Sequence, residues 1–265
     1  MGVNMKKKIS FLGALASVAM LSAPAANAYL IFFGEDLNNS GVVPLASTPN
    51  STTASNNFLA NLIGVGTETF ESQATGASAP LPLTFPGAGT ATLTGGSGSV
   101  STVTPGTTNG VGRYSIPSAT SSNFWEVEAG GSGNFDIGFT STIAALGFFG
   151  IDIGDFGGQL QLSLSNGDLL TVNNTVGAGG STDGSVLFYG IIAQNPSELF
   201  TSVSFLTSTG GGDFFAFDNF TIGTLEQVDP DPGNPVPVSS TLALIGLGLL
   251  GLGANRRNRR QSRAA

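Results

Sequence analysis

Short stretches in which apolar and polar residues alternate run through the middle of the chain. Because successive side chains of a strand point to opposite faces, this alternation predicts strands with one buried face. The clearest stretches are residues 67–72, 90–94, 124–128, 143–153, 159–164, 185–193, 200–205 and 214–222. Asn166 and Gly167 separate two apolar runs and predict a hairpin turn. About a dozen short strands joined by turns predict an all-β domain, a jelly-roll-like β-sandwich over residues 29–225.

One segment has helical spacing instead. Residues 51–63 place their apolar side chains on one side of a helix, and Gly64 follows as a stop signal. Those apolar residues are Ala54, Phe58, Leu59 and Leu62. The sequence therefore predicts one short helix among the strands.

The N-terminal residues have the three parts of a secretory signal. Lysines at positions 6–8 precede an apolar stretch from residue 9 to about residue 21, and small residues ending in Ala26-Asn27-Ala28 follow. This layout predicts a signal peptide over residues 1–28, cut by signal peptidase between Ala28 and Tyr29. An N-terminal transmembrane helix is the weaker alternative, because the apolar stretch is short and the cleavage motif is good.

The C-terminal residues predict a membrane segment. Residues 239–254 carry no charge, and arginines at 256, 257, 259, 260 and 263 follow them. An apolar helix that ends in arginines is typical of a membrane span whose basic end stays in the cytoplasm. The same run contains G-x-G-x-x-G from Gly246 to Gly251, but a dinucleotide-binding loop needs a strand before it and a long helix after it. Residues 226–238 are rich in Pro and Asp and predict a stiff linker.

Residues 236–260 resemble a known sorting signal. Val236, Pro237, Val238, Ser239 and Ser240 precede the Gly/Leu-rich span and the basic tail, and this layout is similar to the PEP-CTERM signal of Gram-negative bacteria. Val238 stands where that family has Glu, and Ser239 where it has a second Pro. The resemblance implies anchoring in the inner membrane, processing by an exosortase-type enzyme, and delivery to the cell surface or an exopolysaccharide matrix.

The charges are strongly partitioned along the chain. The whole sequence has 9 Lys plus Arg and 17 Asp plus Glu. Between residues 29 and 238 the only basic residue is Arg113, against all 17 acids, which gives 1 − 17 = −16. This sign excludes nucleic acid and anionic membrane surfaces as partners of the exported part. Divalent cations, basic surfaces and neutral sugars remain compatible with it.

The chain contains neither cysteine nor histidine. Disulfides, thiol chemistry, Ser-His-Asp triads and nearly all zinc or iron sites are therefore excluded. An enzyme with this composition would depend on carboxylates. We therefore expect a non-catalytic protein of the cell surface or matrix, associated with exopolysaccharide. A secreted carboxylate-dependent glycan hydrolase and a dedicated carbohydrate-binding module are the alternatives.

Two acidic stretches are candidate metal sites. Residues 70–76 and 214–223 resemble the first and last strands of calcium-containing jelly-roll carbohydrate-binding modules, and the resemblance implies Glu71 and Asp218 as ligands of a structural calcium ion. Acids at strand ends near turns are the alternative. Asp152 and Asp155 flank Gly154, and here the favoured interpretation is a buried strand that ends in an Asp-containing turn.

Two further side chains invite a functional interpretation. Trp125, the only tryptophan, shares a predicted strand face with Val127, whereas Glu126 and Glu128 lie on the other face. This pattern favours a core position over a sugar-stacking platform. Arg113 is expected to form a structural ion pair with one of the many acids.

Overall fold

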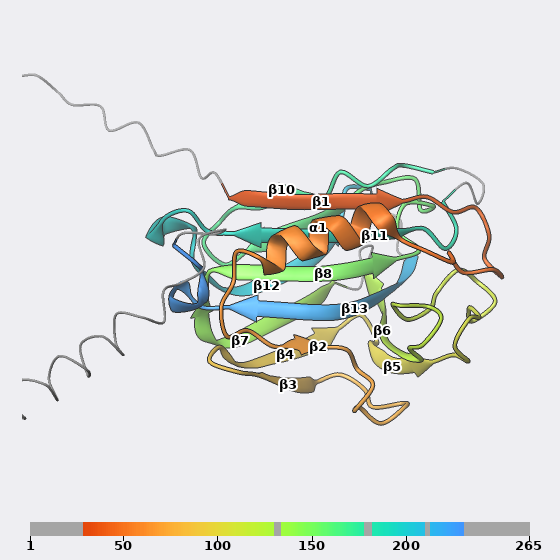
Figure 1. The fold of residues 1–265 in the computed structure, drawn as a ribbon, viewed down its shortest axis with the longest axis horizontal. Coiled ribbons are helices and arrows are strands. Elements are labelled where there is room, and N and C mark those ends of the chain that lie inside the picture. The colour runs from red at the N-terminus through yellow and green to blue at the C-terminus, as the bar shows by residue number, and fades with distance from the viewer. Residues whose placement is uncertain (1–28, 130–133, 178–181, 210–212, 231–265) are drawn as a thin grey trace, which may run out of the picture.

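Two antiparallel β-sheets pack face to face in the computed structural model of this protein (Figure 1). The structure describes residues 29–129, 134–177, 182–209 and 213–230. The predicted all-β sandwich is confirmed.

Within the described ranges, thirteen strands make up the two sheets. The seven-stranded sheet contains, in spatial order, β1 (Leu30–Asp36), β11 (Val186–Ile192), β8 (Ala145–Ile151), β13 (Asp213–Gly223), β6 (Asn123–Ala129) and β5 (Ser99–Thr102), with β2 (Thr67–Glu68) also paired to β13. The six-stranded sheet contains β10 (Leu169–Thr171), β9 (Leu160–Leu164), β12 (Phe200–Thr207), β7 (Phe135–Ile143), β4 (Gly89–Gly95) and β3 (Leu81–Phe85). The helical elements are α1 (Pro49–Leu59) and two 3-10 turns, η1 (Pro196–Glu198) and η2 (Leu225–Gln227).

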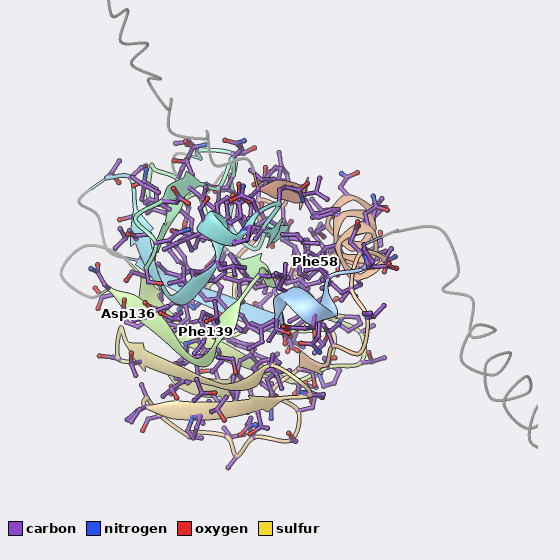
Figure 2. The ribbon with its side chains drawn as sticks, turned by 90° about the vertical axis from the view of Figure 1, so that its left-hand side faces the viewer. Phe58, Asp136 and Phe139 are labelled. Carbon is purple, nitrogen blue, oxygen red and sulfur yellow. The ribbon has the colours of Figure 1, made fainter. Side chains whose placement is uncertain are left out.

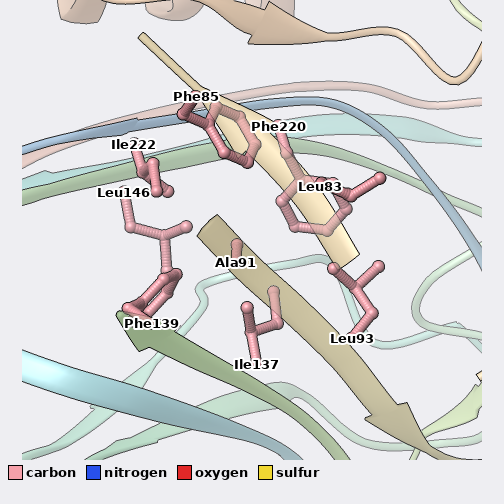
Figure 3. Close-up of a pocket in the computed structure, with 9 residues that line it drawn as sticks. All are labelled: Leu83, Phe85, Ala91, Leu93, Ile137, Phe139, Leu146, Phe220 and Ile222. Carbon is pink, nitrogen blue, oxygen red and sulfur yellow. The ribbon is translucent and has the colours of Figure 1, made fainter. Parts of the chain in front are cut away.

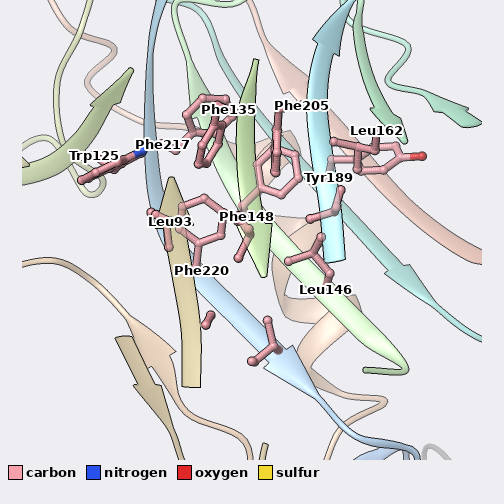
Figure 4. Packing of buried hydrophobic residues seen from close by; sticks show 14 of the residues in the cluster. Leu93, Trp125, Phe135, Leu146, Phe148, Leu162, Tyr189, Phe205, Phe217 and Phe220 are labelled. Atoms are coloured by element: carbon pink, nitrogen blue, oxygen red, sulfur yellow. The ribbon is translucent and has the colours of Figure 1, made fainter. Parts of the chain in front are cut away.

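Phenylalanine rings fill the space between the sheets (Figure 4). The Phe135 ring lies 4.5 Å from that of Phe205 and 5.3 Å from that of Phe217, measured between centroids. Trp125 is fully buried in the same cluster, so its predicted core position is confirmed. Its neighbours Glu126 and Glu128 are only half-buried on the opposite face.

Helix α1 covers the outer face of the seven-stranded sheet. Its Phe58 ring lies over two paired glycines, Gly147 in β8 and Gly190 in β11. A Cβ atom on Gly147 would come within 2.6 Å of the ring, so only glycine allows this close approach. Seen from one end of the sandwich, Phe58 lies on the side of α1 and Asp136 on the opposite side (Figure 2). The prediction of residues 51–63 is corrected to Pro49–Leu59.

Several strand boundaries differ from the predicted ones. The stretch 67–72 is extended only over β2, because Phe70 has a left-handed backbone with φ 58° and turns the chain. The stretch 143–153 contains the end of β7 and all of β8, and it stops at Asp152, where φ is 66°. Strand β1 was not predicted because its apolar and polar residues do not alternate. It is an edge strand in which both Leu30 and Ile31 are exposed. Strands β3, β5 and most of β7 were also not predicted.

The described chain enters and leaves the sandwich at the same end. Strand register places Leu30 opposite Ile192, Ile192 opposite Ala145, and Ala145 opposite Gly223. Ile151 lies at the other end of β8, about 20 Å away at 3.3 Å per residue. Figure 1 shows β1 beginning and β13 ending on the left, and β8 ending on the right. The loops after β8 are therefore far from both chain ends.

Residues 226–229 of the predicted linker still pack on the sandwich. The Nε2 atom of Gln227 donates to the carbonyl oxygens of Gly64 (2.8 Å) and Pro86 (2.9 Å). The predicted signal peptide (1–28), sorting motif (236–240) and membrane segment (239–254) lie outside the described residues. Within the described part of the chain, no helix has the length and apolar character needed to span a bilayer.

An apolar gap lies between strands β3 and β4 and the opposite sheet (Figure 3). Its lining consists of Leu83, Phe85, Ala91, Leu93, Ile137, Phe139, Leu146, Phe220 and Ile222. The gap does not admit a water molecule. It is a packing feature of the core and offers no polar group to a sugar or a cation.

Candidate metal centre

Three aspartates converge at the end of the sandwich where β8 stops. Asp152 directly follows β8, Asp155 lies three residues further, and Asp183 lies three residues before β11. One carboxylate oxygen from each residue lies within 4.8 Å of the others. We call these three residues the acidic corner. Oxygen atoms of this kind and spacing can hold a metal ion.

The backbone fixes Asp152 in this position. Its Oδ1 atom accepts a hydrogen bond from the Gly184 amide (2.8 Å), and its own amide donates to the Ser185 carbonyl (2.9 Å). Gly112 lies directly against the carboxylate, since a Cβ atom there would be 2.1 Å from Oδ1. Gly112 also has φ +90°, a conformation that favours glycine. The carboxylate is therefore pre-positioned by two other segments of the chain.

Arg113 supplies the positive charge of this region. Its Nε atom lies 2.5 Å from Glu126 Oε1, and its Nη1 atom lies 3.4 Å from Asp152 Oδ2. The same Nη1 atom donates to the Phe214 carbonyl (3.3 Å), and the guanidinium carbon is 5.9 Å from the centroid of the Phe214 ring. The expected ion pair is confirmed. One arginine cannot neutralise all the acids around it.

Burial, together with the surplus of acids, shifts the titration of the corner. The pKa of Asp152 is raised to about 7, mainly by burial and also by the charges of Asp155 and Asp213, whereas the Gly184 amide and Arg113 lower it. Burial also raises the pKa of Asp155 to about 6, again with a contribution from Asp213. Both shifts mean that ionising these carboxylates is unfavourable without an added positive charge.

Two buried oxygen atoms in this region have no hydrogen-bond partner among the residues that the structure describes: Asp155 Oδ1 and Thr182 Oγ1. Thr182 is 1 % exposed. Its Oγ1 atom lies beside Gly154, which stands between Asp152 and Asp155 in the sequence, because a Cβ atom added to this glycine would be 3.2 Å from Oγ1. Such atoms are rare in folded proteins, because an unpaired buried polar group costs about 1–3 kcal/mol. A bound cation would pair with oxygens of this kind.

The acidic corner opens into a shallow pocket of about 410 Å³. The lining consists of Gly41, Gly110, Val111, Arg113, Asp152, Asp155, Asp183, Asp213 and Phe214. A hydrated ion or a small polar ligand can therefore reach the carboxylates from solvent.

The other predicted pair, Glu71 and Asp218, lies in a different environment. Asp218 is completely buried, and its Oδ2 atom accepts hydrogen bonds from Ser115 Oγ and the Ile116 amide, both at 2.8 Å. Its Oδ1 atom accepts from the Asn219 amide (2.7 Å). Burial raises the pKa of Asp218 to about 8, and the charge of Glu71 contributes to this increase.

Glu71 is exposed in the turn after β2 and accepts hydrogen bonds from the backbone at the start of β6. Its Oε1 atom accepts hydrogen bonds from the amides of Ser122 and Asn123, both at 2.8 Å. Both predicted ligands thus have protein donors on their oxygens. A calcium ion at Glu71 and Asp218 stays a prediction.

Sequence reasoning undervalued the acidic corner. Asp152 and Asp155 were expected to form a simple turn, and Asp183 was not singled out. The spacing Asp-x-x-Asp between glycines was the available signal. Asp183 is 28 residues beyond Asp155, so only the pairing of β11 with β8 brings it close.

Comparisons with known proteins are sparse. No protein-family model matches the sequence, and no curated protein matches it significantly. Among solved structures, the K2 cleaved adhesin domain of Lys-gingipain is similar with 14 % identity and a TM-score of 0.35, over 61 % of this chain and 98 % of that one. TmCBM61 in complex with β-1,4-galactotriose is similar with 14 % identity and a TM-score of 0.28, over 59 % of this chain and 94 % of that one. These TM-scores are too low to support an inference about ligands.

Proposed function

We propose that this chain is an exported, non-catalytic protein of the cell surface or extracellular matrix, stabilised by a calcium ion in the acidic corner. The observation that carries the metal site is the convergence of three carboxylates, one of which, that of Asp155, keeps a buried oxygen without a hydrogen-bond partner among the described residues. The bound ion would join the loop after β8 to the segment before β11. It would also offset the repulsion within a strongly acidic domain.

Calcium fits the donors better than other common metals do. The acidic corner offers only oxygen, whereas zinc and copper sites use nitrogen or sulfur from residues that this chain lacks. Calcium accepts six to eight oxygens in a flexible geometry, and magnesium demands a near-ideal octahedron. Three loop carboxylates on two separate segments suit the flexible ion. The rest of the coordination shell would come from water or a ligand.

The export part of the proposal rests on the chain termini. The basic-apolar-small layout of residues 1–28 and the PEP-CTERM-like layout of residues 236–260 support secretion, exosortase processing and association with exopolysaccharide. Mass spectrometry of the mature protein from a host with an exosortase tests this. We expect a polypeptide that starts at Tyr29 and lacks the residues after about Val238. A soluble cytosolic chain that keeps both segments would contradict it.

The jelly-roll interpretation belongs to the same proposal. The eight consecutive strands β6 to β13 supply two four-stranded layers, β11-β8-β13-β6 and β10-β9-β12-β7. Jelly rolls consist of eight strands in two such layers, connected by two Greek keys. The remaining strands extend these layers at their edges.

Calcium binding is tested with the purified protein by calorimetric titration and by thermal unfolding with calcium or a chelator. At a hundredfold excess over Kd, a ligand specific for the folded state adds about 2.7 kcal/mol. For a domain of this size we expect Tm to rise by about 5–10 °C. Asp155→Asn should abolish the rise, and Asp136→Asn, in strand β7 of the other sheet, should leave it unchanged. No calcium response in the unmodified protein would end the proposed site.

The raised pKa values give one reason to keep a second candidate function. A carboxyl with a pKa near 6 or 7 is suited to general acid catalysis, and two carboxylates can hydrolyse glycosides. Incubation with a panel of polysaccharides tests a hydrolase. Reducing ends released by the unmodified protein and lost in Asp152→Asn would favour catalysis over the non-catalytic proposal.

A further inference from the structure

An exposed aromatic ring lies at the mouth of the acidic corner. Phe214, the second residue of β13, is 42 % exposed, and it lines the same pocket as the three aspartates. Val111 lines the pocket as well and is 56 % exposed. The pocket thus combines an apolar rim with an acidic floor.

Arg113 holds the ring in a defined position relative to the acids. Its guanidinium lies over the Phe214 ring and donates to the Phe214 carbonyl, while the same group reaches Asp152. One side chain therefore ties the aromatic surface to the acidic corner. A surface held in this way loses little conformational freedom when a ligand binds.

We propose that Phe214 and the acidic corner form one binding subsite for a neutral sugar ring. This inference rests on the proposed calcium site. Vicinal hydroxyl groups of the sugar complete the coordination of the calcium ion, which needs more oxygens than three carboxylates supply. The apolar face of the same sugar stacks on Phe214. The unpaired oxygens of Asp155 and Thr182 supply the independent sign that this corner takes a ligand.

Charge and size favour a neutral sugar over an acidic one. Glu126 and four aspartates, at positions 152, 155, 183 and 213, surround the single charge of Arg113. One calcium ion leaves this region negative, so an anionic ligand would be repelled. A pocket of about 410 Å³ lies in the range of small-molecule sites.

The position of the pocket leaves it accessible from outside. The chain enters at Leu30 and leaves after Gly223 at one end, and the pocket lies at the opposite end of the strands. A domain attached through its C-terminal side therefore presents this pocket away from the attachment surface.

Affinity electrophoresis of the mature protein in gels containing galactan, dextran or mannan tests the subsite, with calcium or a chelator present. We expect calcium-dependent retardation by at least one of these neutral polysaccharides. Phe214→Ala should weaken it about tenfold, from a lost stacking contribution of about 1.4 kcal/mol. Phe214→Trp should retain binding. Phe33→Ala, which truncates an exposed ring on the edge strand β1, is the matched control and should bind normally.

Separate outcomes distinguish the two proposals. If calcium binds in the calorimeter but no neutral polysaccharide retards the protein, the sugar subsite is wrong and the calcium site stands. Retardation only by polygalacturonate would also overturn the neutral-sugar assignment. Equal retardation of Phe214→Ala and the unmodified protein would remove Phe214 from the subsite. If calcium does not bind at all, both proposals fail.

Discussion

The acidic corner and the surroundings of Asp218 are two acidic regions on adjacent strands with different chemistry. Asp218 is completely buried, and three donors satisfy its oxygens. Asp155 in the corner keeps one buried oxygen unpaired, and the corner opens to solvent. Burial and a raised pKa therefore do not by themselves mark a ligand site. The unpaired oxygens and the access route distinguish the two.

The hydrogen bonds of Asp218 indicate a structural role. Through Ser115 and Ile116 the carboxyl connects the loop before β6 to the middle of β13. The same loop carries Gly112 and Arg113, which contact Asp152. We call the surroundings of Asp218 the closed region and the acidic corner the open region. The closed region therefore stabilises the loop whose Gly112 and Arg113 contact Asp152 in the open region.

The largest expected effect comes from breaking the closed region. Asp218→Ala leaves the Ser115 hydroxyl and the Ile116 and Asn219 amides without their acceptor inside the core. We expect the free energy of unfolding to fall by about 3 kcal/mol in urea titrations. The calcium-induced increase in stability should persist in this variant. If it disappears while the fold is retained, the ion binds at Glu71 and Asp218 instead.

Removing one calcium ligand of the open region should have the opposite effect: stability in chelator changes little, and the calcium-induced increase in stability is lost. In chelator, Asp155→Asn is expected to change stability by less than about 1 kcal/mol, because it removes the repulsion with Asp213 and keeps the shape of the side chain. With calcium it should lack the stabilisation of about 2.7 kcal/mol expected at a hundredfold excess of calcium over Kd. Thermal unfolding of the variant and of the unmodified protein, each in chelator and in calcium, measures the change in stability and the stabilisation by calcium. An unchanged calcium response would place the ion elsewhere.

The pH dependence separates the two regions. The folded-state pKa values of Asp152 and Asp218, about 7 and about 8, lie above the ordinary value of 3.8. A raised pKa of an acid contributes stability that is complete below the unfolded pKa and is lost as the pH rises through the folded pKa. Without calcium, stability should therefore fall between about pH 4 and pH 8.

Calcium should flatten the part of this curve that comes from the acidic corner, because the ion favours the ionised carboxylates. Its affinity should rise as the pH increases from 5 to 7.5. The Asp218→Asn variant should keep this rise and lose the stability change near pH 8. Denaturant titrations at several pH values, with and without calcium, measure both trends. A calcium affinity that does not change with pH would contradict the assignment to the acidic corner.

The smallest expected effect on stability comes from replacing Arg113. Arg113→Gln removes the charge that lowers the pKa of Asp152 and Asp155, so stability in chelator should fall by about 1 kcal/mol. The stabilisation by calcium should become larger, because more repulsion is then relieved. Arg113→Lys keeps the charge and serves as the control. A smaller calcium response in the glutamine variant would mean that Arg113 does not compete with the ion.

The sequence by itself determined the all-β class and much of the core, because alternation directly reflects which face of a strand is buried. Trp125 and Val127 were correctly assigned to the core from their spacing alone. The composition also excluded histidine- and cysteine-based chemistry without any structure. These conclusions depend only on local periodicity or on counting, so they need no knowledge of distant contacts.

Only the tertiary structure decided which acids meet. Glu71 and Asp218 were selected by resemblance, whereas the acidic corner depends on the register that pairs Val186 with Ile151. That pairing brings Asp183 to the loop after β8, and a shift of one residue would point the strand's side chains to the other face. Register is set by hydrogen bonds and packing between segments far apart in the chain. Local sequence patterns do not encode them, and the acidic corner was therefore visible only in the folded protein.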